Sequence, residues 1–261
     1  MAFEVNPIAE KPEQQTARRL HLLYHELRRG GSAYSYVVGT EAFERHVILY
    51  ARLRERAAGL LPELTFDDGH RSNLEFAVPI LQSRGLVARF FITVGWTGTR
   101  QGYMSWQELR DLQAAGQSIG AHGWSHTLLT HCTESDLDTE LRQARLVLED
   151  KLGTSITTMS LPGGRYNRRV LAACKDAGYT QVYSSIPRAD NANAQEPLIG
   201  RLNIRGNMQE EWIASLFEPG SAVLAKLERS YRMKAAAKAM LGDKAYEKLW
   251  ALVNRKEQDA E

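Results

Sequence analysis

The sequence has little cysteine, no long apolar run and almost no net charge. Its two cysteines, Cys132 and Cys174, are far apart in the chain, which argues against a disulfide framework and favours a reducing compartment. No apolar run reaches the roughly 18 residues of a membrane span, and the start lacks the pattern of a secretion signal. A formal net charge of +2 gives no basis for nucleic-acid binding. We therefore expect a cytoplasmic protein.

What the chain does contain is an alternation of strand and helix patterns. With 261 residues, 43% of them hydrophobic, it can build one well-buried core. After a polar lead at 1–17, hydrophobic spacing and capping residues predict seven strands and the helices between them. This order predicts an α/β fold, either a parallel barrel or an open doubly wound sheet. The predicted strands are 20–27, 61–66, 88–94, 117–121, 156–161, 180–184 and 202–204, and the helices 41–57, 72–83, 105–115, 136–151 and 168–177.

Two short motifs carry the chemistry. Asp67 and Asp68 follow an apolar strand, and Gly69 can bend the chain so that both carboxylates become available. His122 and His126 follow a later strand, and their spacing puts two imidazoles on one side of a helical turn or tight loop. One carboxylate and two imidazoles suit a catalytic divalent metal, and the second carboxylate can serve as a base.

These motifs and the Leu-Pro-Gly-Gly segment at 161–164 resemble, in order, those of the NodB-homology polysaccharide deacetylases. The likeness covers about 18–208, and it implies a distorted (β/α) barrel. It also implies that Asp68, His122 and His126 hold the metal while Asp67 is the catalytic base. Zinc is the expected metal, with cobalt, nickel or manganese as alternatives.

The chain departs from the family pattern in three places. Gly123 stands where Ser or Thr is common, and the Arg that usually orients the base is missing from the third motif, where Arg165 could substitute. The late catalytic His is also missing, since no His follows His131. However, Tyr24 and His25 resemble the permuted acid segment of the deacetylases that act on biofilm poly-N-acetylglucosamine. We therefore predict that His25 is the general acid, beside the last strand of a closed barrel.

Several further residues are predicted to contact substrate. Two tryptophans could stack on a sugar ring, two arginines could line the pocket or pair with Asp67, and the glycines could allow close approach to a backbone N–H. The predicted substrate-binding residues are Trp96, Trp124, Pro162, Gly163, Gly164, Arg165 and Arg205.

Residues 209–261 are predicted to form a basic helical extension, which could pack across the barrel or touch an anionic membrane surface on the inner face. For the whole chain we predict a metal-dependent deacetylase of an acetylated carbohydrate: an N-acetylated sugar, a glycan precursor or a lipid-linked saccharide. Two alternatives remain open: a carbohydrate-binding pseudoenzyme that keeps the metal pocket, and an amidase or O-acetyl esterase that acts on a small molecule. The sequence does not determine the oligomeric state.

Overall fold

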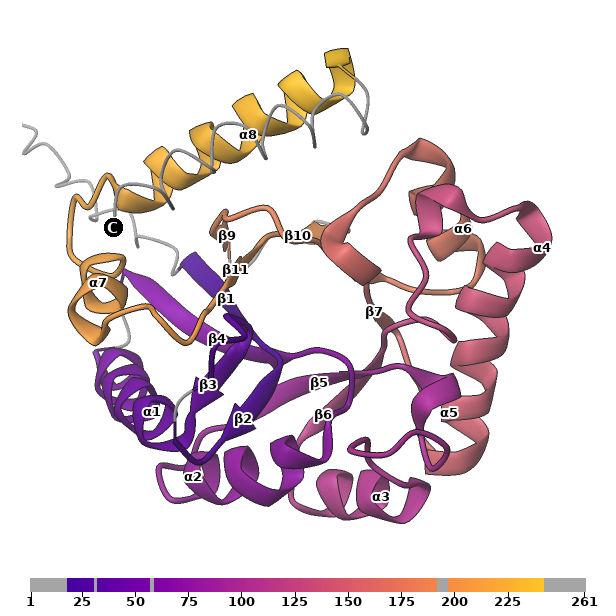
Figure 1. Ribbon diagram of the computed structural model, residues 1–261, viewed down its shortest axis with the longest axis horizontal. Coiled ribbons are helices and arrows are strands. Elements are labelled where there is room, and N and C mark those ends of the chain that lie inside the picture. The colour runs from indigo at the N-terminus through magenta and orange to yellow at the C-terminus, as the bar shows by residue number, and fades with distance from the viewer. Residues whose placement is uncertain (1–17, 31, 57–58, 192–196, 242–261) are drawn as a thin grey trace, which may run out of the picture.

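The central feature of the molecule is a curved parallel sheet with helices on its outer side (Figure 1). This computed structural model describes residues 18–30, 32–56, 59–191 and 197–241. Along the sheet the strand order is β10-β8-β7-β6-β5-β4-β1-β11, every neighbouring pair is parallel, and β9 pairs antiparallel with β1. The strands are β1 Arg18–Tyr24, β4 Leu60–Phe66, β5 Ala88–Ile92, β6 Ser118–Ala121, β7 Thr158–Ser160, β8 Gln181–Tyr183, β9 Asp190–Asn191, β10 Leu198–Ile199 and β11 Arg201–Asn203. The strands β2 Glu26–Arg28 and β3 Val37–Gly39 pair separately with each other.

Helices connect the strands and cover the outside of the sheet, as parallel connections require (Figure 1). Two of these connections contain π-helical segments, Asn73–Ala77 and Asp138–Gln143, continuous with the α-helices that follow. Short 3-10 turns lie at Val94–Trp96, Leu129–His131 and Pro162–Gly164. The helices are α1 Thr40–Glu55, α2 Val78–Gln82, α3 Trp106–Ala114, α4 Glu134–Leu137, α5 Ala144–Leu152, α6 Arg168–Asp176, α7 Glu210–Ser215 and α8 Val223–Leu241.

The sheet closes on itself through a single residue. The strands β10 and β11 occupy the two ends of the strand order, and only Gly200 separates them in the chain. A side chain at Gly200 would come within 2.8 Å of two backbone carbonyl oxygens, so the seam requires glycine. The Ser184 N–H donates to the Ile199 carbonyl where β8 pairs with β10. Across the seam, Arg201 Nε of β11 donates to the Ser184 carbonyl at 3.0 Å. The result is a barrel with one irregular seam, which confirms the predicted distorted (β/α) barrel.

The predicted elements correspond to observed ones with shifts at their ends. The capping box from Ser105 to Glu108 begins α3, and the predicted box from Thr133 to Asp136 begins α4. The predicted strand 20–27 is two strands, β1 and β2, interrupted at His25. The short strands β3, β9 and β10 are not among the predicted strands.

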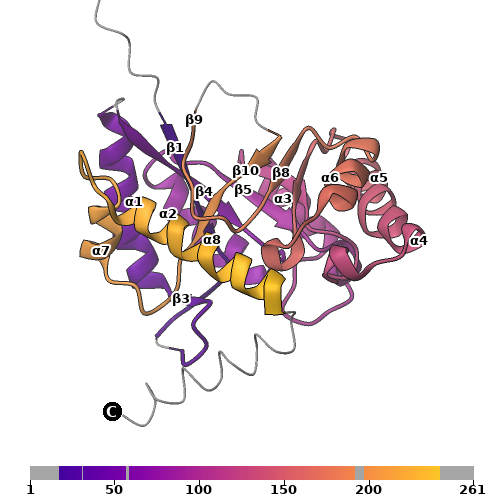
Figure 2. The same cartoon turned by 90° about the horizontal axis from the view of Figure 1, so that it is seen from above.

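Both cysteines are buried free thiols, as expected. The helices α7 and α8 follow the last strand, and Figure 2 shows α8 running from α7 toward the side of the barrel that carries α4 to α6. Residues 242–261 and 1–17 lie outside the described residues, so the predicted C-terminal extension is seen only to Leu241. Within the described part of the chain, no helix combines the length and the apolar character that crossing a membrane requires.

Candidate metal and catalytic site

The carboxylates and imidazoles of the two motifs meet at the carboxyl ends of the strands. Asp67 and Asp68 directly follow β4, His122 directly follows β6, and Ser160 ends β7. Because these strands are parallel, their carboxyl ends form one mouth of the barrel. The site therefore lies where parallel α/β folds place their catalytic groups.

Asp68, His122 and His126 bring one ligand atom each to a common point. Their candidate ligand atoms all lie within 4.8 Å of one another. Asp68 Oδ1 is 3.3 Å from His122 Nε2 and 3.4 Å from His126 Nε2, yet this buried oxygen has no hydrogen-bond donor within the described residues. Three atoms that can ligate, around an oxygen without a donor, are arranged to surround a cation.

The tautomer of His122 supports this interpretation. His122 Nδ1 lies 2.8 Å from the Ser160 carbonyl oxygen, which can only accept, so Nδ1 carries the hydrogen. In the neutral ring, Nε2 then presents its lone pair to Asp68 Oδ1. A carbonyl that fixes the far nitrogen of an imidazole is the usual support for a metal-binding histidine. The residues present therefore fit a divalent metal.

The backbone is strained at two of these three residues. Asp68 has φ 74° and His126 has φ 64°, and they are the only non-glycine residues in the described chain with positive φ. Such conformations are uncommon outside glycine and cost free energy. The bend after β4 was expected at Gly69, which has φ 82°, but it begins one residue earlier, at Asp68 itself. This bend lets the adjacent carboxylates act separately.

Asp67 is held by a guanidinium that the sequence did not reveal. Arg201 Nη1 donates to Asp67 Oδ1 at 2.7 Å, Arg201 Nη2 donates to Oδ2 at 2.9 Å, and the Ser160 hydroxyl also donates to Oδ2. Burial alone would raise the pKa of Asp67, but the charge and the hydrogen bonds of Arg201 outweigh it and hold the pKa well below its usual range. Asp67 is therefore ionised and fixed in orientation at neutral pH.

The expectation that Arg165 replaces the family's orienting arginine is wrong, because Arg201 on β11 takes that place. Arg201 is fully buried, and its guanidinium lies over the adjoining rings of Phe91 and Tyr183. It is 134 residues from Asp67 in the chain. No sequence motif surrounds it, and it lies directly before the predicted strand 202–204, outside the bounds of that strand.

A second missed residue, Glu140, organises the loop between the two histidines. Residues 122–126 form an irregular loop rather than a helical turn. The buried Glu140 carboxylate accepts hydrogen bonds from the backbone N–H groups of Trp124 and Ser125 and from the Ser125 hydroxyl. A side chain at Gly123 would come within 2.7 Å of Glu140 Oε2. The glycine at this position is therefore explained by the carboxylate that it accommodates.

His25 lies beside the carboxylates, immediately after β1, whose neighbours are β4 and β11. Its Nδ1 is buried with no hydrogen-bond partner in the described residues, and its ring meets Tyr36 edge-on at 5.1 Å. Burial lowers the pKa of His25, while the negative charges of Asp67 and Asp68 act to raise it. The position beside the last strand agrees with the one expected for the acid.

Of the predicted substrate-binding residues, Trp96 and Arg205 lie beside the site, whereas Trp124 packs against the core. Trp96 stacks on His126 at 5.2 Å and so borders the site, whereas Trp124 is half-buried and packs against the core. Arg205 lies over the Tyr36 ring, next to His25. These placements leave the substrate roles of the residues as predictions.

The 161–164 segment forms a tight turn beside the histidine loop. Pro162 is buried and faces Gly123, while Gly163 and Gly164 both have positive φ. The Gly164 N–H already donates to the Leu161 carbonyl at 2.8 Å, so it cannot also serve an oxyanion. Arg165, at the end of this turn, is half-buried.

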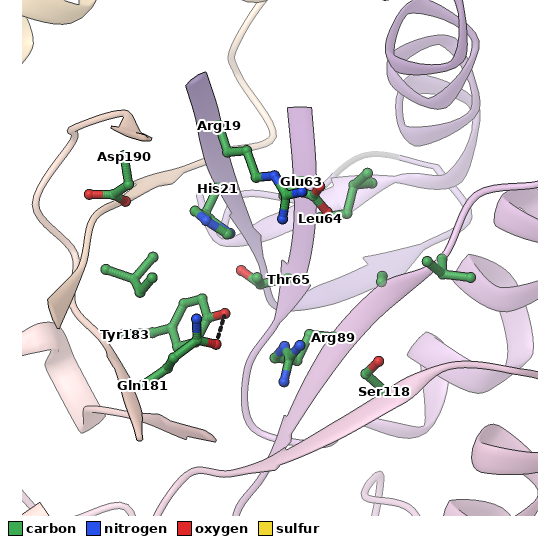
Figure 3. Close-up of a pocket in the computed structure, with 13 residues that line it drawn as sticks. Arg19, His21, Glu63, Leu64, Thr65, Arg89, Ser118, Gln181, Tyr183 and Asp190 are labelled. Carbon is green, nitrogen blue, oxygen red and sulfur yellow. Dashed lines mark hydrogen bonds and ion pairs between the residues drawn. The ribbon is translucent and has the colours of Figure 1, made fainter. Parts of the chain in front are cut away.

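A separate cavity of about 170 Å³ lies at the opposite, amino end of the barrel (Figure 3). Arg19 pairs with Glu63 at 3.7 Å in it, and His21 packs edge-on against Tyr183. Burial, with the charges of Arg201, Arg19 and Arg89, lowers the pKa of His21 to about 3, so this imidazole is neutral. The cavity is lined by Arg19, His21, Arg89 and Ser118 from the first halves of their strands, together with residues such as Thr65 and Tyr183 from later positions, and it does not include the candidate metal residues.

Comparison with known proteins gives a family-model match in sequence and a set of solved structures with a similar fold. Residues 61–182 match the family model described as polysaccharide deacetylase. The Bacillus subtilis (strain 168) protein YxkH, a candidate polysaccharide deacetylase, is 25% identical over 203 residues, covering 72% of this chain and 71% of its own. A chitin deacetylase of Pestalotiopsis sp is 29% identical over 127 residues, covering 49% of this chain and 42% of its own.

Two solved structures share the fold. The Streptococcus pyogenes deacetylase PplD, solved in complex with acetate, has a TM-score of 0.68 at 20% identity and covers 77% of this chain and 99% of its own. IcaB from Ammonifex degensii has a TM-score of 0.64 at 19% identity and covers 81% of this chain and 97% of its own. At these identities the likeness establishes the barrel fold.

Proposed function

We propose that this chain is a polysaccharide deacetylase, a metal-dependent hydrolase that removes acetyl groups from an N-acetylated sugar, a glycan precursor or a lipid-linked saccharide. The observation that carries the proposal is the buried Asp68 Oδ1, which faces two imidazole nitrogens and has no donor within the described residues. A base and an acid lie beside it. Together these groups provide what amide hydrolysis requires.

Asp68, His122 and His126 would hold the metal, and zinc suits two imidazoles and one carboxylate, with cobalt, nickel or manganese as alternatives. What such an ion supplies when bound is polarisation of the acetyl carbonyl and a lower pKa for water, from about 15.7 to about 7. The Ser160 carbonyl fixes His122 and the Glu140 carboxylate fixes the histidine loop, so the chain holds its three donors in place.

Asp67 acts as the general base in this proposal. It is ionised at neutral pH, so it can accept the proton of the attacking water. Both of its oxygens already accept hydrogen bonds from Arg201, which prevents the carboxylate from rotating. Arg201 is a positioning residue, since its guanidinium is fully buried beneath the carboxylate.

His25 acts as the general acid. An amine expelled without a proton is a very poor leaving group, so a donor is required when the carbon–nitrogen bond breaks. Burial lowers the pKa of His25 overall, and the negative charges of Asp67 and Asp68 oppose this shift toward the neutral imidazole. Tyr36 packs on the ring edge and limits its movement.

Metal analysis together with acetate release tests the proposal. We expect about one bound divalent metal per chain and acetate release from N-acetylglucosamine oligomers, with release lost in Asp67→Asn and in His25→Ala. Acetate from esters but never from amides would instead support the O-acetyl esterase. Metal binding without release from either substrate class would support the carbohydrate-binding pseudoenzyme.

A further inference from the structure

Two exposed arginines at the carboxyl mouth of the barrel are held over aromatic rings. The guanidinium carbon of Arg100 lies 4.2 Å from the centre of the Trp96 ring, and that of Arg205 lies 5.6 Å from the Tyr36 ring. Arg100 also lies 4.9 Å from the Tyr103 ring. Contact with the aromatic rings restricts the positions of the Arg100 and Arg205 guanidinium groups.

The same rings contact the imidazoles of the site. Trp96 stacks on His126 at 5.2 Å, and Tyr36 meets His25 at 5.1 Å. Each arginine is therefore separated by one aromatic ring from an imidazole of the proposed machinery. One lies on the side of the metal ligand and the other on the side of the acid.

A third arginine repeats the pattern next to the site. The Arg29 guanidinium lies 5.4 Å from the Phe76 ring, and both residues line a cavity of about 420 Å³. His70 lines the same cavity and is only two residues from the metal-ligand candidate Asp68. The cavity therefore adjoins the mouth of the barrel.

These three arginines differ from their neighbours in having no carboxylate partner. Arg28 and Arg71 also line this cavity, but each is paired with a glutamate at 2.9 Å. Among the described residues, Arg29, Arg100 and Arg205 form no ion pair. Stacking occupies the flat face of a guanidinium and leaves its N–H edge free to donate to an anion.

We infer that the acetylated saccharide on which this site acts is anionic, with phosphate or carboxylate groups on either side of the acetylated sugar that reach Arg100, Arg205 and Arg29. The inference rests on the proposed function and narrows its substrate class. A neutral chitin-like chain offers these arginines only hydroxyl groups, whereas a charged group forms the stronger, charge-assisted hydrogen bond.

The test compares three acetylated saccharides: neutral N-acetylglucosamine oligomers, N-acetylglucosamine 1-phosphate, and an oligosaccharide in which N-acetylglucosamine alternates with a uronate. The kcat/KM for acetate release is measured at low and high salt for wild type, Arg29→Gln, Arg100→Gln and Arg205→Gln. Arg84→Gln is the matched control, because Arg84 is exposed near the start of β5, at the other end of the barrel.

We expect wild type to prefer a charged substrate by about tenfold or more at low salt, and the preference to shrink with added salt. Each of the three variants should lower the charged-to-neutral ratio by about three- to tenfold, through KM, while Arg84→Gln keeps it. A higher kcat/KM on the phosphate or on the uronate substrate identifies which anionic group of the saccharide the arginines bind. Equal rates on charged and neutral substrates, or a preference that survives all three substitutions, would overturn the inference.

Isothermal calorimetry on the Asp67→Asn variant measures saccharide binding without turnover, so it tests the inferred preference for anionic substrates independently of catalysis. The same saccharides are titrated into this variant alone and combined with each arginine substitution. If wild type releases no acetate from any substrate, the proposed function fails, and binding still decides the inference. Tighter binding of the charged saccharides that depends on the arginines supports it, and equal binding of all three saccharides refutes it.

Discussion

The two mouths of the barrel are both rich in charged and polar residues, yet they are built differently. At the amino end Arg19 pairs with Glu63. At the carboxyl end a buried oxygen of Asp68 faces two imidazole nitrogens without a donor. Satisfied pairs stabilise or solubilise a fold, whereas converging acceptors leave a position for a cation. The difference shows that polarity alone does not mark a site, and that an unsatisfied set of acceptors does.

His21 and His25, four residues apart in the chain, show the same contrast between the two ends of the barrel. Burial is the largest influence on both imidazoles and lowers the pKa of each. The leading charges then differ, because the guanidinium groups of Arg201, Arg19 and Arg89 lower the pKa of His21 further, whereas Asp67 and Asp68 act to raise that of His25. His21 is therefore a neutral packing residue, whereas at His25 two carboxylates oppose the shift that burial causes.

The largest effect should come from Asp67→Asn, with Glu63→Gln as a separate control variant. Removing the base should lower kcat for acetate release by about 10³- to 10⁴-fold, because the water proton then has no acceptor. The Glu63 variant, changed at the other mouth, should keep the rate within about twofold. Acetate assays on both proteins at equal metal occupancy measure this, and an Asp67→Asn enzyme with a tenth of the wild-type rate would refute the assignment.

A slightly smaller effect is expected from His25→Gln, measured beside His21→Gln. The first should lower kcat by about 10²- to 10³-fold at unchanged stability, since the leaving amine loses its proton donor. The second should keep kcat and lower the free energy of unfolding by about 1 kcal/mol, from the lost aromatic contact with Tyr183. Chemical denaturation and acetate assays distinguish them, and equal kcat values for the two variants would contradict our assignment of the acid.

Arg201→Gln should change the pH dependence. The guanidinium holds the pKa of Asp67 low, so its removal raises that pKa and protonates the base at higher pH. Activity should therefore fall off at a higher pH on the acidic side of the profile than in wild type. The uncompensated buried carboxylate should also cost about 3–5 kcal/mol of stability. The pH profile of kcat/KM distinguishes the two roles of Arg201, because a purely structural role would lower the rate equally at every pH.

Glu140→Gln should weaken metal binding rather than chemistry. Its carboxylate orders the loop that carries His126, so the neutral amide should lower metal affinity by about 10- to 100-fold. Competition with a chromophoric chelator measures the affinity. At saturating metal the rate should return close to wild type, and a rate that stays low would show that Glu140 acts on catalysis directly.

The smallest effect should come from Arg19→Gln at the amino mouth. The Arg19 side chain is 48% exposed and its pair with Glu63 spans 3.7 Å, so the substitution should change the free energy of unfolding by no more than about 0.5 kcal/mol. Metal content and acetate release should stay as in wild type. A loss of either would mean that the two mouths are coupled.

Much of the site could be read from the sequence because its parts are local. Asp67 and Asp68 stand together at a strand end, and His122 and His126 lie within one loop, so a short motif encodes each pair. The strands and helices that carry them have clear periodicity and caps, as with Asn167 at the start of α6. His25 was recognisable only through the resemblance of its segment to the family.

The sequence by itself determined the alternation of strand and helix, the order of the motifs and the two short motifs that contain the candidate metal ligands, since each of these depends on neighbours within a few residues. Only the tertiary structure decided that Arg201 clamps Asp67, that Glu140 orders the histidine loop, and that Gly200 closes the barrel. These residues act across long stretches of chain, and a lone arginine, glutamate or glycine has no local pattern that distinguishes it. Burial explains the roles of Arg201 and Glu140, because a charged group removed from water needs an oppositely charged or hydrogen-bonding partner nearby in the fold.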